Sequence, residues 1–272
     1  MHLPQIDRRT LLAFGGAALV QPTFASAYRA PSDPSLERII RHHVHSRGGK
    51  AALDAIRHTN SSMNLTEDGR TIQGGYIAST DGFVRVDIFS HGVRVYSEGV
   101  DAQGGWNWNG DAASPSPEGE EGTKNLRRSI ELNLFGLHRF AERGHQLKLI
   151  GREIVDGVRY FVIEVRMRDG SVNNFYINPT SWLIDRSRSQ RTFHPDLDPK
   201  KSWIESRFSA FRKVQGISVS THGEEFDLLK KEVVQTTTST GVTFNQPFDP
   251  AVFSRHFPNA GSLKALGVPV EG

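Results

Sequence analysis

The chain has 272 residues, with 33 Lys and Arg against 30 Asp and Glu, and no cysteine. The net charge is only +3 and bases are interspersed with acids, which argues against a nucleic-acid-binding protein, because such proteins gather Lys and Arg into one patch. The absence of cysteine excludes disulfides, Cys-ligated metals and a thiol nucleophile. The length suits one large β domain.

Residues 1–27 have the layout of an export signal. Arg8 and Arg9 precede a short apolar run that ends at Val20, and small residues follow at 25–27. The run is about half as long as a bilayer span requires. The paired arginines resemble a twin-arginine signal, and an ordinary secretion signal that carries them by chance is the alternative. We therefore predict a cleavable signal over 1–27 and one soluble periplasmic domain over 28–272, without a transmembrane segment.

The first half of this domain changes from helical to strand periodicity. Apolar spacing predicts a helix over 33–47, with Asp33 as its N-cap, and a short helix over 50–57. From Ser61 the apolar period is two, and the predicted strands are 71–79, 82–89, 93–97 and 101–109. Residues 112–122 are rich in Pro, Gly and Glu, so we expect a mobile acidic loop there.

The second half begins with a helix, which an apolar stripe predicts over 124–143. Asp-Gly pairs at 156–157 and 169–170 predict hairpins, and a polar loop is expected over 194–202. The predicted strands are 147–155, 158–167, 171–178, 182–192, 203–212, 217–222 and 225–236. These elements predict a mostly β chain with a few helices (α+β), built as one strongly curved antiparallel sheet with helices on its concave side.

Several short motifs recur in one order along the chain. They are Gly48-Gly49-Lys50-Ala51-Ala52-Leu53, Phe83-Val84-Arg85-Val86, Gly104-Gly105-Trp106, the segment Leu149–Tyr160, the segment Tyr176–Ile184 and the segment Phe211–Ile217. In this order and spacing, the region 33–253 resembles the LolA/LolB-like superfamily of outer-membrane lipoprotein-sorting proteins. The resemblance implies a half-open antiparallel barrel whose concave face is capped by helices and encloses an apolar cavity for acyl chains. The loops at 112–122 and 194–202 depart from the dedicated lipoprotein carrier, so the cargo is left open.

The strand that begins at Phe83 is the first candidate for a ligand-binding wall. Apolar residues occur on both of its faces, which is expected when one face meets packed core and the other meets a cavity. Phe83 and Phe89 are therefore candidate ligand contacts. Arg85 resembles the cavity arginine of the family, which hydrogen-bonds helix carbonyls in the closed, empty state. The alternative interpretation is an exposed arginine that pairs with Asp87.

Further candidates are large apolar side chains. Trp106 and Trp108 alternate on one strand face and are able to contact a ligand, although ordinary core aromatics have the same pattern. The helix over 124–143 would supply the inner face of a lid, and core packing explains the same residues equally well. Its candidate ligand-binding residues are Leu134, Phe135, Leu137 and Phe140.

Histidines carry the enzyme alternative. His42, His43 and His45 cluster on the first helix, where His43 falls on the apolar stripe. His42 and His45 are three apart and could share a face as metal ligands do, but no carboxylate stands at a matching offset, so a solvated helix face is the preferred interpretation for these two. His194 lies near Asp196 and Asp198 at a spacing that matches no mechanism. Nucleophile-elbow, zinc-protease and phosphate-loop motifs are absent from the sequence. We predict no metal and no cofactor, and we assign no catalytic residue.

Three functional hypotheses follow. The first is a periplasmic carrier that holds a lipid, a lipoprotein acyl chain or another hydrophobic molecule, because burial of each CH₂ gains about 0.8 kcal/mol without charged clamps. It would exchange cargo with an inner- or outer-membrane partner protein. The second is an exported enzyme with lyase- or hydrolase-type acid–base chemistry on a small hydrophobic substrate. The third is a sensor of envelope lipids that binds a protein partner.

Overall fold

The computed structural model describes residues 34–192 and 200–256. The helices are α1 (Leu36–Arg47), α2 (Lys50–Asp54) and α3 (Glu120–Leu134), with 3-10 turns η1 (Leu137–Arg139) and η2 (Pro250–Phe253). The strands are β1 (His58–Glu67), β2 (Arg70–Ser79), β3 (Val84–Ser90), β4 (Val93–Asp101), β5 (Gly104–Asn109), β6 (Ser116–Pro117), β7 (Gln146–Val155), β8 (Val158–Arg166), β9 (Val172–Ile177), β10 (Ile184–Arg191), β11 (Ser202–Ser209), β12 (Arg212–Val214), β13 (Ile217–Val219), β14 (His222–Asp227) and β15 (Glu232–Phe244).

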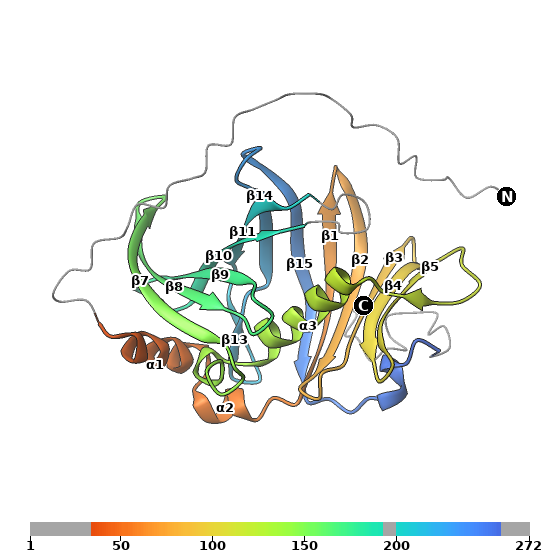
Figure 1. Cartoon of the computed structure of the whole chain (residues 1–272), viewed down its shortest axis with the longest axis horizontal. Helices are drawn as coiled ribbons and strands as arrows, with labels where there is room; N and C mark the ends of the chain where they lie inside the picture. Colours follow the sequence, from red (N-terminus) through yellow and green to blue (C-terminus); the bar gives the residue numbers. More distant parts are fainter. Residues whose placement is uncertain (1–33, 193–199, 257–272) are drawn as a thin grey trace.

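Thirteen strands form one antiparallel sheet in the order β6-β5-β4-β3-β2-β1-β15-β14-β11-β10-β9-β8-β7. The sheet curves but does not close, because β6 and β7 stand at opposite edges (Figure 1). Strands β12 and β13 pair separately as a hairpin. Helix α3 crosses the middle of the sheet, while α1 and α2 lie at its β7–β9 end (Figure 1). The predicted fold class, a curved antiparallel sheet with a helix-capped concave face, is confirmed.

Turn residues set the register of the hairpins. Asp156 and Gly157 both have positive φ, 49° and 79°, which is the backbone that a tight two-residue hairpin requires. This turn joins β7 to β8 with Val155 opposite Val158, as the Asp-Gly pair predicts.

Strand alternation gives the sheet two covered faces near β3. Val84 and Val86 point to the concave side, where they join the main core with the α3 residues Leu126, Ile130 and Leu134. The side chains at the alternate positions, Arg85, Asp87 and Phe89, therefore point to the opposite face. That face is covered by η2, whose Val252 and Phe253 pack with Phe89 and Ile77.

Several predicted boundaries are wrong for local physical reasons. Helix α1 begins at Leu36, because the Ser35 side chain accepts the capping hydrogen bond from the Arg38 N–H. The predicted N-cap, Asp33, lies outside the described residues. Helix α3 ends at Leu134 and not at 143, because Phe135 is extended, with φ −107° and ψ 135°, and Gly136 follows.

The predicted acidic loop and one predicted strand are also revised. The region 112–122 contains β6, paired with β5, and the first turn of α3, so its loop is shorter than expected. The predicted strand 225–236 is two strands, β14 and β15, because a turn at Leu228–Lys231 reverses the chain and Lys231 has φ 59°. The predicted signal at 1–27 and most of the loop at 194–202, with His194, Asp196 and Asp198, lie outside the described residues.

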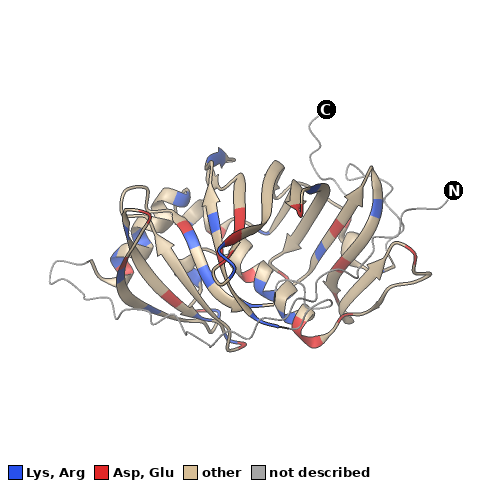
Figure 2. Ribbon diagram, turned by 90° about the horizontal axis from the view of Figure 1, so that it is seen from above, with Lys and Arg blue, Asp and Glu red and all other residues tan. Residues whose placement is uncertain are grey.

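Charges of both signs are interspersed over the strands, as the mixed composition predicts (Figure 2). Among the described residues, no helix is both long enough and apolar enough to cross a membrane.

Helix α1 docks through a buried histidine. The His43 Nδ1–H donates a hydrogen bond of 2.8 Å to the carbonyl oxygen of Trp182, and His43 is 1% exposed. His42 stacks on the Trp182 ring at 4.4 Å. Burial, with Arg47 and His138 nearby, lowers the pKa of His43 to about 4. His43 is therefore neutral in the folded protein near pH 7.

This burial predicts acid sensitivity. The pKa of His43 is depressed from 6.5 to about 4 on folding, so the unfolded chain binds the extra proton between these values. We expect the free energy of unfolding to fall by about 3 kcal/mol from pH 7 to pH 4. His43→Asn keeps a donor for the Trp182 carbonyl but cannot titrate. Urea titrations at stepped pH should show a flatter profile for this variant, and equal slopes in both proteins would contradict the assignment.

Candidate functional site

The concave face under α3 is the first candidate site. Leu134, Phe135, Leu137 and Phe140, the predicted inner face of a lid, are all buried there in the main core. Phe140 is 1% exposed and packs edge-on against the His145 ring. The structure therefore brings these four predicted residues together, although only Leu134 belongs to α3 itself.

Apolar side chains that are only partly buried continue this concave face beyond the packed core. They come from β2, β3, β7, β10, β15 and α3, and they are Tyr76, Val86, Leu149, Ile184, Val242 and Leu132. Tyr76 donates to or accepts from Ser129 Oγ of α3 at 3.2 Å, and burial raises the pKa of its hydroxyl. The concave face thus offers apolar surface that its own helices do not cover completely, which is the surface an acyl chain needs.

Polar contacts from the second half of α3 hold the helix to the rest of the fold. Glu131 accepts hydrogen bonds from Arg143, 2.5 and 2.7 Å, and from His145, 3.2 Å. Burial opposes ionisation of Glu131, but these bonds prevail and hold the pKa of its carboxyl below the usual value. Arg128 bonds Asp169 at 2.5 Å in the loop between β8 and β9. The helix is therefore attached by ion pairs as well as by its apolar stripe.

The other five predicted ligand residues lie on the opposite face. Phe83 and Phe89 belong to the apolar cluster with η2, and Arg85 lies among them, 1% exposed. Trp106 is opposite Gly99 in the register, and Gly99 is opposite Arg85, so the three share a face. Trp108 follows on the same face at the sheet edge. The sequence showed that these residues alternate along their strands, but not which face of the sheet η2 covers.

Arg85 has a complete set of partners on this face. Its Nε and Nη2 donate to the two carboxylate oxygens of Asp87 at 2.8 and 3.0 Å, and Nη1 donates to the carbonyl of Val252 at 3.1 Å. Asp87 also accepts from Ser97 and Arg94. The pairing with Asp87 is present as the alternative interpretation proposed, in a buried and not an exposed position. Arg85 here bonds the carbonyl of the C-terminal 3-10 turn.

We expect Asp87→Ala to destabilise the fold by about 3–5 kcal/mol, because it leaves the Arg85 cation buried without its counter-charge. The double variant Arg85→Met/Asp87→Leu removes both charges and should recover most of this loss. Chemical denaturation of the two variants measures the difference. A double variant as unstable as Asp87→Ala would show that the ion pair is not the reason.

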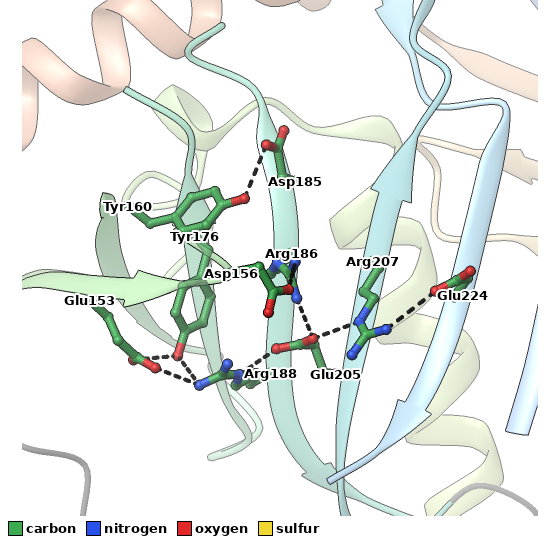
Figure 3. A network of polar contacts seen from close by, with 10 residues as sticks. All are labelled: Glu153, Asp156, Tyr160, Tyr176, Asp185, Arg186, Arg188, Glu205, Arg207 and Glu224. Carbon is green, nitrogen blue, oxygen red and sulfur yellow. Dashed lines mark hydrogen bonds and ion pairs between the residues drawn. The ribbon is translucent and has the colours of Figure 1, made fainter. Parts of the chain in front are cut away.

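A cavity of about 350 Å³ lies over β8–β14, on the face opposite α3. Its lining residues are Tyr160, Asp185, Arg186, Arg207, Phe208, Ser209 and Glu224. Beneath it Glu205, 1% exposed, accepts from Arg186, Arg188 and Arg207 at 2.7, 2.7 and 2.8 Å (Figure 3). Each of these arginines also bonds another carboxylate, as Arg188 bonds Glu153 at 2.7 Å.

Every charged group of this network already has a partner within it. We therefore interpret the network as structural, because its bonds connect β7, β10, β11 and β14. Sequence reasoning missed it. The available signal was charged residues at a period of two, Arg186 and Arg188 on one strand and Glu205 and Arg207 on the next. Period two shows that each pair shares a face, whereas the register that brings the pairs together comes only from the sheet.

The clustered histidines separate in the structure. His43 is buried against Trp182, His42 stacks on the Trp182 ring and His45 is exposed. Within 34–192 and 200–256, no group of three or more His, Asp or Glu side chains is arranged to hold a metal ion.

No family model and no curated protein matches the sequence. Solved structures match the fold. A LolA superfamily protein from Nitrosomonas europaea aligns with TM-score 0.55 and 12% identity, over 82% of this chain and 98% of that one. A DUF1329 family protein from Desulfovibrio piger aligns with TM-score 0.53 and 12% identity, over 80% of this chain and 96% of that one. A putative outer membrane lipoprotein-sorting protein domain from Vibrio parahaemolyticus aligns with TM-score 0.51 and 8% identity, over 80% of this chain and 95% of that one. The chain therefore has the LolA-like fold.

Proposed function

We propose that this chain is a periplasmic carrier that binds a hydrophobic or amphiphilic molecule between α3 and the concave face of the sheet. The observation that carries the proposal is the incompletely covered apolar surface of that face, on a sheet that stays open at both edges. The names of the similar structures, which include lipoprotein sorting, support the same class of cargo. Residues 1–27 would direct export, and a membrane-associated protein would load or receive the cargo.

In this proposal the ligand-binding residues are those of the concave side. Tyr76, Val86 and Val242 from the sheet would contact the chain of the ligand, opposite Leu132 and Leu134 of α3. Arg85 and Trp106 would instead fix the chain end on the opposite face. A ligand would enter by moving α3, because the buried stripe of this helix occupies the centre of the concave face.

The cargo can be identified directly. We expect native mass spectrometry of the protein purified from its own periplasm to show a bound species, and solvent extraction to release a molecule with one or more acyl chains. The same protein unfolded, refolded and mixed with hexadecanol should bind about one equivalent. A protein that is empty when isolated and that takes up no apolar probe would contradict the carrier proposal.

A reversible lock tests whether α3 must move. An ideal Cβ placed on Gly105 of β5 would lie 2.9 Å from the Cβ of Thr123 in α3, whereas a disulfide needs about 3.8 Å, so a small outward shift suffices. The chain has no native cysteine to interfere. We expect oxidised Gly105→Cys/Thr123→Cys to lose uptake of a fluorescent fatty acid, and the reduced form to regain it.

The two single-cysteine variants are the controls, and both should bind under oxidising and reducing conditions alike. Uptake by the oxidised double variant at the wild-type rate, with the disulfide confirmed by mass spectrometry, would show that the ligand does not enter beneath α3.

A further inference from the structure

The last residue of α1 carries a charge without a partner. Within 34–192 and 200–256, the Arg47 side chain has no hydrogen-bond or ion-pair partner, and its Nε is buried without an acceptor. It follows His43 by four positions and Val44 by three, so it continues the stripe of α1 that faces the fold interior. All other arginines in deep positions described above, such as Arg85 and Arg188, have carboxylates beside them.

The fold covers Arg47 only in part. Burial lowers the pKa of its guanidinium and covers its Nε, while the side chain keeps part of its accessible surface. Helix α1 contacts β13 here, where Ser218 Oγ donates to the carbonyl of Ser46 at 3.0 Å, and the hairpin residues Val214 and Val219 pack on the core.

Other basic groups lie near Arg47. Arg47 and His138 both lower the pKa of His43, so both are within electrostatic reach of it. His138 Nδ1 is a second buried nitrogen without a partner. The carboxylate in this neighbourhood, Asp54, is bonded by His138 Nε2 at 2.8 Å and paired with Lys50. The balance of charge at this end of the concave face is therefore positive.

An unpaired buried cation costs free energy, and a helix C-terminus offsets only a part of it. His45, the other basic residue in the last turn, is exposed, so a basic side chain can stand at this helix end without being buried. A guanidinium presents a planar fork of donors that fits a carboxylate or phosphate with two parallel hydrogen bonds. An oxyanion from outside the chain would supply both the missing counter-charge and the missing acceptor.

We propose that Arg47 binds the carboxylate or phosphate headgroup of a single-chain amphiphile whose acyl chain lies along the concave apolar face. This inference rests on the proposed carrier function and specifies its cargo as anionic. Val44 of the same helix stripe packs in the main core, so the cation stands at the α1 end of the concave face, where a headgroup would lie if its chain followed the sheet.

Matched ligands separate the headgroup from the chain. Palmitate and hexadecanol have the same chain length and differ in charge. We expect wild-type protein to bind palmitate at least tenfold more tightly than hexadecanol. Arg47→Met should lose this preference, with hexadecanol affinity unchanged, and Arg47→Lys should retain most of it. Arg41→Met, at an exposed position of the same helix, is the control and should bind both ligands as wild type does.

Thermal unfolding of the empty proteins distinguishes ligand binding from a structural role. Removal of an uncompensated charge should leave the Tm of Arg47→Met equal to or above that of wild type, whereas a structural arginine would give a lower Tm and weaker binding of both ligands. Equal affinity of wild type for palmitate and hexadecanol overturns the anionic headgroup but leaves the carrier function intact. Failure to bind either ligand overturns both.

Inorganic phosphate and lysophosphatidic acid separate the two sources of an oxyanion. Lysophosphatidic acid should bind far more tightly than inorganic phosphate alone. Equal affinities of the two, both dependent on Arg47, would mean a site for a free anion and would overturn the amphiphile.

Discussion

An antiparallel sheet that curves without closing must have its apolar side chains covered, because water would otherwise reach them on both faces. In this chain, α1 and α3 cover the concave face and η2 covers part of the other. The two covers differ in kind. The concave side is covered by an apolar stripe with ion pairs beside it, such as Glu131 with Arg143. The opposite side depends on a buried arginine that bonds the backbone of η2. The first kind of cover is able to move without breaking its own backbone hydrogen bonds.

Arg85 and Arg47 differ in the partners that surround their charges. Arg85 has both oxygens of Asp87 and a carbonyl as acceptors, so its charge is compensated within the chain and contributes to the position of η2. Among the described residues, Arg47 has neither a carboxylate nor a carbonyl as acceptor, so the empty protein bears the cost of covering its Nε. Sites that bind ligands commonly keep such costs because the ligand removes them. The contrast between complete and missing partners, and not burial itself, is the reason for proposing that Arg47 binds a ligand.

The network around Glu205 connects four strands of the sheet through ion pairs. Three arginines converge on this carboxylate from adjacent strands and extend to Glu153 and Glu224 at its margins (Figure 3). These bonds cross β7, β10, β11 and β14, so they resist bending of the sheet in the region where α1 docks.

Local patterns in the sequence determined most of the strands, the Asp-Gly hairpin at 156–157 and the apolar stripe of α3, because each depends on residues within one element or one turn. They missed the turn that divides 225–236 into β14 and β15. They did not determine the limits of the helices where a single cap decides, as Ser35 does for α1. The period of two in β3 showed that Val84 and Arg85 point to different faces, but not which face the helices cover. That choice rests on contacts such as Arg85 to Val252, 167 residues apart, which only the tertiary structure brings together. The same holds for Arg47, because a sequence shows where an arginine stands but not that every possible partner lies elsewhere.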